Sequence, residues 1–126
     1  MLLHLTEFSQ EPLQGQISRQ IRAKILGEDL PAGTCLPSIR ALAREHRVSV
    51  ITVERAYQLL ERDGLIFSRR GKGFFVSELS QAAKKKLANH RLIENLERQI
   101  RDALAEGLSA AEIRESVEKL LAQSGQ

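Results

Sequence analysis

The chain has 126 residues and a formal net charge of +3, and its 42% hydrophobic and 28% charged residues are typical of a folded domain rather than a disordered chain. No apolar run is long enough to span a bilayer, and the first residues lack the pattern of a signal peptide, so we expect a cytoplasmic protein with no membrane partner. The single cysteine cannot form an internal disulfide, and the three histidines are too far apart for a metal site, so we expect no metal and no cofactor. We expect Cys35 to be a small buried or half-buried residue rather than a redox sensor.

The excess positive charge lies entirely in the N-terminal part of the chain. Residues 1–77 hold 11 Lys and Arg against 8 Asp and Glu, whereas residues 78–126 hold 8 of each. A basic region permits nucleic-acid binding without proving it. The sequence pattern also changes after Val76, so we predict two domains, at residues 1–77 and 78–126.

The first predicted helix follows a short extended lead-in over residues 1–10. Proline suits the first turn of a helix, where its missing N–H costs no hydrogen bond, so Pro12 marks the start. Apolar residues then recur every four positions and share one helical face: Leu13, Ile17, Ile21 and Ile25. Turn-forming residues at 27–33 end this helix.

Two further helices follow, separated by a short break at residues 47–49. Pro37 marks the start of the first, which buries Ile39, Leu42 and Ala43. Ser49 caps the second, because its hydroxyl can accept a hydrogen bond from a free N–H of the first turn, and Gly64 closes it as a left-handed residue. The break is too short for an antiparallel pair, so these helices should cross steeply, as in a helix-turn-helix.

A β-hairpin is predicted next. Residues 65–68 and 74–76 are rich in strand formers, and the segment between them is basic and carries two glycines. Three helices followed by a hairpin is the order of elements in a winged helix-turn-helix domain. The predicted fold class is therefore α+β, mainly α, with a hairpin wing and a helical segment after it.

This arrangement predicts a DNA-binding surface, with the third helix in the major groove and the wing over the backbone or minor groove. Arginine and lysine side chains suit phosphates and base edges, and a glycine lets the wing backbone approach the duplex. The predicted DNA-binding residues are Ser38, Arg40, Ser49, Val50, Ile51, Thr52, Arg55, Arg69, Arg70, Gly71 and Lys72. Each polar residue of this set could instead be a helix cap or a solvated surface group.

The C-terminal part contains two amphipathic helices. The first spans residues 80–106, and a capping box of Ser109 and Glu112 starts the second. Two short helices cannot close a core alone, so their apolar stripes must pack on the same chain or on a twofold partner, and symmetric dimers are the commonest oligomers. The predicted dimerisation residues are Leu92, Leu96, Ile100, Leu104, Ile113, Val117, Leu120 and Leu121.

Six linked motifs within residues 10–77 resemble the GntR family of bacterial repressors. They are Pro12-Leu13 with Gln16-Ile17, Leu36–Ala43, Val48–Val53, Ala56–Leu60, Gly64–Ile66 and Gly71–Val76. The resemblance implies that Arg40 contacts a base, that Ser49–Thr52 begin the recognition helix, and that Gly71 enters the minor groove. The short C-terminal part is similar to the YtrA-type subfamily, whose members carry a two-helix dimerisation segment. One departure is Glu54, where many members carry a cation.

We therefore predict a sequence-specific homodimeric regulator that represses transcription by occluding a palindromic operator. No nucleophile and base, and no pair of carboxylates, are arranged as a catalytic site, so no enzymatic activity is expected. A small-molecule effector could release the DNA by changing the spacing of the two winged helices, from a site at the dimer interface. The alternative is a winged-helix protein-interaction module, or an architectural protein that binds DNA without sequence preference.

Overall fold

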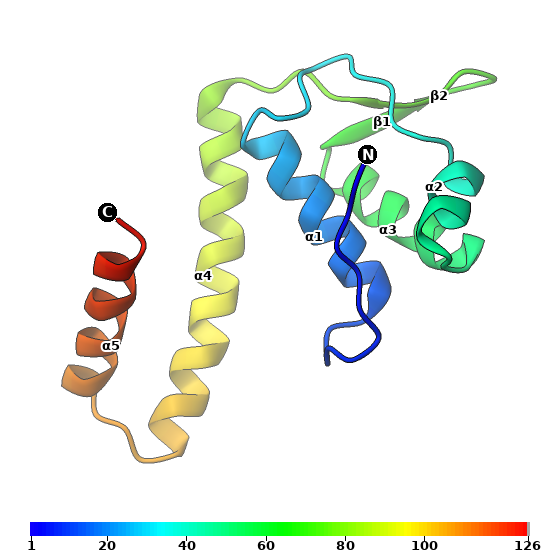
Figure 1. Cartoon of the computed structure of the whole chain (residues 1–126). Coiled ribbons are helices and arrows are strands. Elements are labelled where there is room, and N and C mark those ends of the chain that lie inside the picture. The colour runs from blue at the N-terminus through cyan, green and yellow to red at the C-terminus, as the bar shows by residue number, and fades with distance from the viewer. Residues whose placement is uncertain (126) are drawn as a thin grey trace. The chain divides into compact units, whose positions relative to one another are not determined.

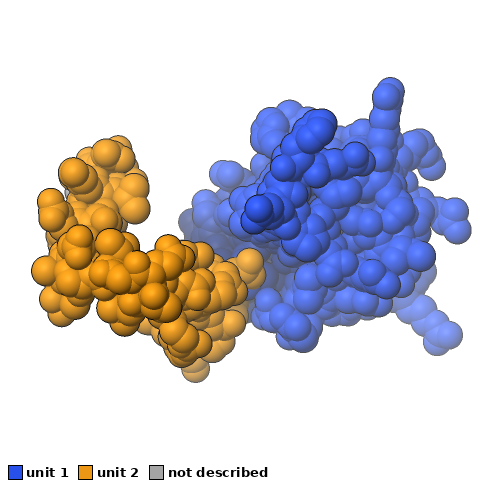
Figure 2. All heavy atoms as spheres, turned by 90° about the horizontal axis from the view of Figure 1, so that it is seen from below, with its two compact units in different colours: residues 1–84 blue, residues 85–126 orange. Residues whose placement is uncertain are grey.

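The computed structural model describes residues 1–125, which form five helices and one two-stranded antiparallel sheet (Figure 1). The elements are α1 (Leu13–Leu26), α2 (Ile39–His46), α3 (Val50–Arg62), β1 (Ile66–Arg69), β2 (Gly73–Val76), α4 (Gln81–Ala105) and α5 (Ala110–Gln123). This order confirms the predicted mainly helical α+β fold with a hairpin wing. The chain divides into two compact units, residues 1–84 and 85–126 (Figure 2). Along residues 1–125, no helix combines the length and the apolar character needed to cross a membrane.

Helix α3 lies at the centre of the first unit, where it packs against α1, α2 and β1. The predicted apolar stripes form the core. The fully buried large side chains of the three helices are Ile17, Ile21, Ile25, Leu42, Val53, Tyr57 and Leu60. Ile39, which we expected in the buried stripe of α2, is only half-buried because it occupies the first position of that helix.

Pro12 and Pro37 lie just before the helices whose starts they were expected to mark. Pro12 is the N-cap of α1 and not a first-turn residue as we predicted, whereas Pro37 directly precedes the N-cap of α2, the helix whose start we expected it to mark. Ser38 caps α2, with its Oγ accepting a hydrogen bond from the Ala41 N–H at 3.1 Å. The predicted end of α3 is confirmed, because Gly64 follows the C-cap with φ at +77°.

The wing is a β-hairpin in which Phe67 pairs with Phe75 and Arg69 with Gly73. The turn is closed by the Lys72 N–H, which donates to the Arg69 carbonyl at 2.9 Å. A third segment bridges β2 through Cys35 and Phe75. Our expectation of a buried or half-buried Cys35 is wrong: the side chain is exposed, because successive side chains of an extended segment alternate and the next residue, Leu36, takes the buried side.

An N-terminal arm before α1 is held by side chains of the helical core. The Gln16 side chain accepts from the Thr6 N–H at 3.0 Å and donates to the Thr6 carbonyl at 2.8 Å. Gln20, one turn further along α1, makes the same two-point contact with His4. His46 Nε2 accepts from the Leu3 N–H at 3.0 Å. These bonds anchor a segment for which the sequence indicated only an extended path.

Candidate nucleic-acid interface

Helices α2 and α3 are joined by a turn of three residues, Arg47, Val48 and Ser49. Arg47 is the C-cap of α2 and adopts the left-handed conformation, with φ at +54°. The Val48 N–H donates to the Ala43 carbonyl at 3.0 Å, which closes the end of α2. The compact turn produces the helix-turn-helix predicted from the sequence.

The start of α3 is organised by the Ser49 hydroxyl. Its Oγ accepts from the Thr52 N–H at 3.0 Å and lies 2.7 Å from Thr52 Oγ1. Val50 and Ile51 beside it are 41% and 59% exposed, although both are large apolar residues. In a major groove, exposed apolar side chains can contact thymine methyl groups, and hydroxyls beside them can donate hydrogen bonds to phosphates.

Tyr57 fixes the position of α3 relative to the segment that leads into α2. This side chain is fully buried, and its hydroxyl donates to the Pro37 carbonyl at 2.7 Å. Its ring meets Phe74 of the wing edge to face, with centroids 5.1 Å apart. Burial raises the pKa of Tyr57 well above its ordinary value, and the nearby Cys35 thiol adds to this shift. The hydroxyl therefore stays neutral and remains a donor.

The cations on the helix-turn-helix and the wing are exposed and uncompensated. Within residues 1–125, no carboxylate pairs with any of the predicted DNA-binding cations, which are Arg40, Arg55, Arg69, Arg70 and Lys72. Arg69 instead lies over the Phe67 ring, 5.6 Å from its centroid. By contrast, Arg19 and Arg22 of α1 are paired with Glu11 and Asp63, at 3.0 and 3.3 Å. Along residues 1–125, the predicted DNA-binding cations of α2, α3 and the wing therefore carry positive charge that no carboxylate of the chain pairs with.

The predicted DNA-binding residues come from three places in the first unit. Ser38 and Arg40 begin α2, and the stretch from Ser49 to Arg55 begins α3, whereas residues 69–72 form the wing tip. In Figure 1 the wing tip, α2 and the start of α3 lie at the same end of the first unit. Gly71 has φ at +74°, a conformation that disfavours side chains, so the wing tip presents bare backbone there.

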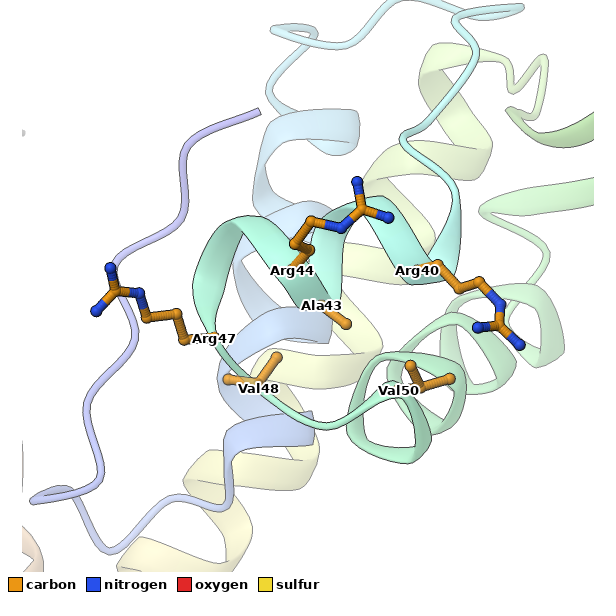
Figure 3. Close-up of a pocket in the computed structure, with 6 residues that line it drawn as sticks. All are labelled: Arg40, Ala43, Arg44, Arg47, Val48 and Val50. Atoms are coloured by element: carbon orange, nitrogen blue, oxygen red, sulfur yellow. The ribbon is translucent and has the colours of Figure 1, made fainter.

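The sequence analysis missed two arginines of this surface, Arg44 and Arg47. With Arg40 they surround an open hollow of about 400 Å³ beside the turn, whose other lining residues are Ala43, Val48 and Val50 (Figure 3). The signal that could have found them is their spacing, because positions 40, 44 and 47 follow one helical face and its C-cap.

The second unit carries the predicted dimerisation residues. None of the described residues of α4 and α5 is buried, and Leu92, Leu104 and Leu120 are each more than half exposed. An apolar groove of about 370 Å³ runs between the two helices, lined chiefly by Leu96, Ile100, Ala103, Leu108, Ile113, Val117 and Leu120. The predicted capping box of Ser109 and Glu112 is present, with its two hydrogen bonds at 3.0 and 3.1 Å.

These features define a winged helix-turn-helix protein with a cationic recognition surface. The sequence model of a family described as "Bacterial regulatory proteins, gntR family" matches residues 13–76, which is half of the chain. The chain belongs to this GntR family and is a DNA-binding transcription regulator. The family and the relatives below are regulators and not enzymes, which confirms the prediction of a non-enzymatic protein.

Two relatives from Bacillus subtilis match most of the chain. The HTH-type transcriptional regulator YhcF is 31% identical over 112 residues, which cover 86% of this chain and 89% of YhcF. The HTH-type transcriptional repressor YtrA is 29% identical over 121 residues, which cover 96% of this chain and 93% of YtrA. The similarity to YtrA extends through the helical second unit and confirms the predicted subfamily resemblance.

Two solved structures are similar to this chain in fold. A transcriptional antiterminator from Listeria monocytogenes EGD-e aligns with a TM-score of 0.76 at 31% identity, covering 100% of this chain and 91% of that one. The DNA-binding domain of AraR, solved in complex with operator ORR3, aligns with a TM-score of 0.50 at 25% identity. That match covers 60% of this chain and 95% of the AraR domain.

Proposed function

We propose that the protein represses transcription by binding a palindromic operator as a homodimer. The observation that carries the proposal is the surface formed by α2, the start of α3 and the wing. Its cations are exposed, and no carboxylate among residues 1–125 pairs with them. Such cations release condensed counterions when they meet phosphates, which drives binding. Repression is supported by the similarity to the repressor YtrA.

Sequence recognition is assigned to the first turns of α3 and to Arg40. Val50 and Ile51 are exposed at the position where a recognition helix meets base edges, and Thr52 and Ser49 offer hydroxyls beside them. Arg40 can present a planar fork to a guanine, the commonest specific contact in the major groove. Ser38 combines a capping role with a phosphate contact at the start of α2. The exposed Arg55 would contact a phosphate beside the groove.

The wing supplies a second, shallower contact. Arg69, Arg70 and Lys72 surround Gly71 at the tip of a hairpin only four residues long on each side. The glycine allows the backbone to approach the minor groove, and the three cations flank it where phosphates border that groove.

Dimerisation is assigned to the helical segment that follows the winged helix, with the functional division at residues 77 and 78. The apolar faces of α4 and α5 are uncovered in a single chain, and two short helices cannot bury them alone. A twofold partner would cover both faces and place two recognition helices on one side of the DNA. The half-sites would then lie about one helical turn of DNA apart, ~10 bp, or a multiple of it. A small-molecule effector at this interface would release the operator by changing that spacing.

The experiment that tests the proposal compares affinity for a preferred duplex with affinity for a scrambled duplex of the same length and composition. A sequence-reading repressor is expected to prefer its operator by ~10³-fold or more at near-physiological salt. A ratio near one, with strong salt dependence, would support an architectural DNA-binding protein instead. No binding to either duplex would support a protein-interaction module.

A further inference from the structure

We infer that Arg44 and Arg47 contact backbone phosphates of the operator, beside Arg40 and outside the contacts to base edges. The inference rests on the proposed function, because it takes DNA as the occupant of the hollow beside the helix-turn-helix. The site would add affinity to every duplex and no sequence preference, since phosphates carry no base information.

The shape of the hollow suits a compact anion such as a phosphate of the duplex. Its floor is formed by the small apolar side chains of Ala43, Val48 and Val50, and its rim by the three arginines (Figure 3). Arg40 and Arg47 extend outward at opposite ends of the hollow and Arg44 lies between them, so the three exposed guanidinium groups point in different directions in Figure 3. A volume of about 400 Å³ leaves room for a phosphate and for the long side chains to fold over it.

The charges of this hollow are not neutralised by the protein. No acidic residue lines it, and no carboxylate within residues 1–125 pairs with any of its three arginines. The acidic neighbour in sequence, Glu45, lies near the N-terminal ammonium group, 3.9 Å away. Three cations therefore border this opening with no carboxylate beside them, and their uncompensated charge would attract an anion.

The backbone of Arg47 identifies a substitution that removes the charge and keeps the turn. With φ at +54°, this residue occupies a conformation that glycine adopts without cost and that other L-residues adopt at a cost. Glycine would therefore make the same turn at least as well. An arginine at this position adds nothing to the turn itself, whereas its side chain adds a charge to the rim of the hollow.

The hollow is continuous with the proposed DNA surface. It shares Arg40 and Val50 with that surface, so DNA seated on the start of α3 would run past the hollow. Arg44 lies one helical turn after Arg40 on α2. A contact made there falls on the sugar-phosphate backbone beside the groove rather than on a base.

The test measures the salt dependence of binding for Arg47→Gly and Arg44→Ala, using the preferred duplex and a scrambled duplex. Each variant should lower the slope of log affinity against log salt by about 0.9 per protomer, and should weaken both duplexes by the same factor. Arg47→Lys keeps the charge and should keep the slope. The matched control, Arg98→Ala, removes a cation of α4 that is remote from the hollow in sequence and should leave the slope unchanged.

Thermal unfolding separates a lost contact from a damaged fold. The midpoint of Arg47→Gly should equal or exceed that of the wild type, because the turn at this position favours glycine. Unchanged slopes in both Arg47→Gly and Arg44→Ala would overturn the inference, as would losses confined to the preferred duplex. If the wild type itself did not distinguish the two duplexes, the proposed repressor function would fail, while equal slope changes on both duplexes would still support the phosphate site.

Discussion

The hydrogen bond between Tyr57 and Pro37 is expected to hold the recognition helix in place, and Tyr57→Phe tests it. The substitution removes only the hydroxyl, which donates to the Pro37 carbonyl at 2.7 Å. The ring would still fill its site and still meet Phe74 edge to face. The loss should therefore report on a single bond rather than on packing.

The size of the expected loss of stability follows from the burial of this hydrogen bond. The Tyr57 side chain is fully buried, whereas Pro37 is half-buried, so the carbonyl left behind is partly shielded from water. Losing one net hydrogen bond and leaving its acceptor poorly solvated costs about 1–2 kcal/mol in the free energy of unfolding. For a unit of this size, that cost corresponds to a drop of roughly 5–15 °C in Tm.

Urea unfolding followed by circular dichroism measures this free energy, and Thr34→Val is the matched control. Thr34 also donates a hydroxyl to a proline carbonyl, that of Pro31 at 2.6 Å, but the bond is exposed. Water can replace it, so the control should change the stability by less than about 0.5 kcal/mol. A Tyr57→Phe variant as stable as the wild type, or no less stable than Thr34→Val, would refute the structural role assigned to this bond.

Three further predictions concern the DNA surface, the helical segment and pH. Arg40→Ala should weaken binding to the preferred duplex by about 1–3 kcal/mol and binding to a scrambled duplex by less, as measured by fluorescence anisotropy; equal losses would show that Arg40 only holds phosphate. Leu120 is 62% exposed in the single chain, so Leu120→Asp should convert the dimer to a monomer without loss of helix content. Sedimentation equilibrium measures this change, and a wild type that is already monomeric would contradict the dimer proposal. The pKa of Tyr57 is raised by burial, so its contribution to stability should be complete below the unfolded pKa of about 10 and should fall as the pH rises above it. The urea midpoint should fall between pH 8 and 11 in the wild type and should fall less in Tyr57→Phe. Equal falls in the two proteins would contradict this pH dependence of the Tyr57 contribution.

The apolar pattern was sufficient to predict the core of the first unit. The four-residue spacing of Ile17, Ile21 and Ile25 reports burial directly, because one face of a helix must leave water. The caps at Ser49 and Gly64 were also predictable, since each satisfies a local backbone requirement that depends only on neighbouring residues.

Features that depend on distant partners were not predictable in the same way. The contacts of Gln16 and Gln20 with the N-terminal arm depend on where that arm crosses α1. The exposure of Cys35 depends on its bridge to Phe75, 40 positions away in the chain. Neither feature leaves a periodic trace in the sequence.

The candidate site shows the same division between local and distant information. The positions of Arg40 and of the wing cations followed from predicted element boundaries and from the family resemblance. The hollow that also includes Arg44 and Arg47 became visible only when the turn between α2 and α3 was defined in space. Arg47 in particular holds a left-handed conformation that its residue type does not suggest.

The most direct test of the central claim is a selection of bound sequences from a random duplex pool, using the purified protein at near-physiological salt. A homodimeric repressor should enrich an inverted repeat with a fixed half-site spacing of about one helical turn of DNA, ~10 bp, or a multiple of it. The absence of any enriched sequence, with protein that is folded by circular dichroism, would contradict sequence-specific recognition and remove the repressor proposal.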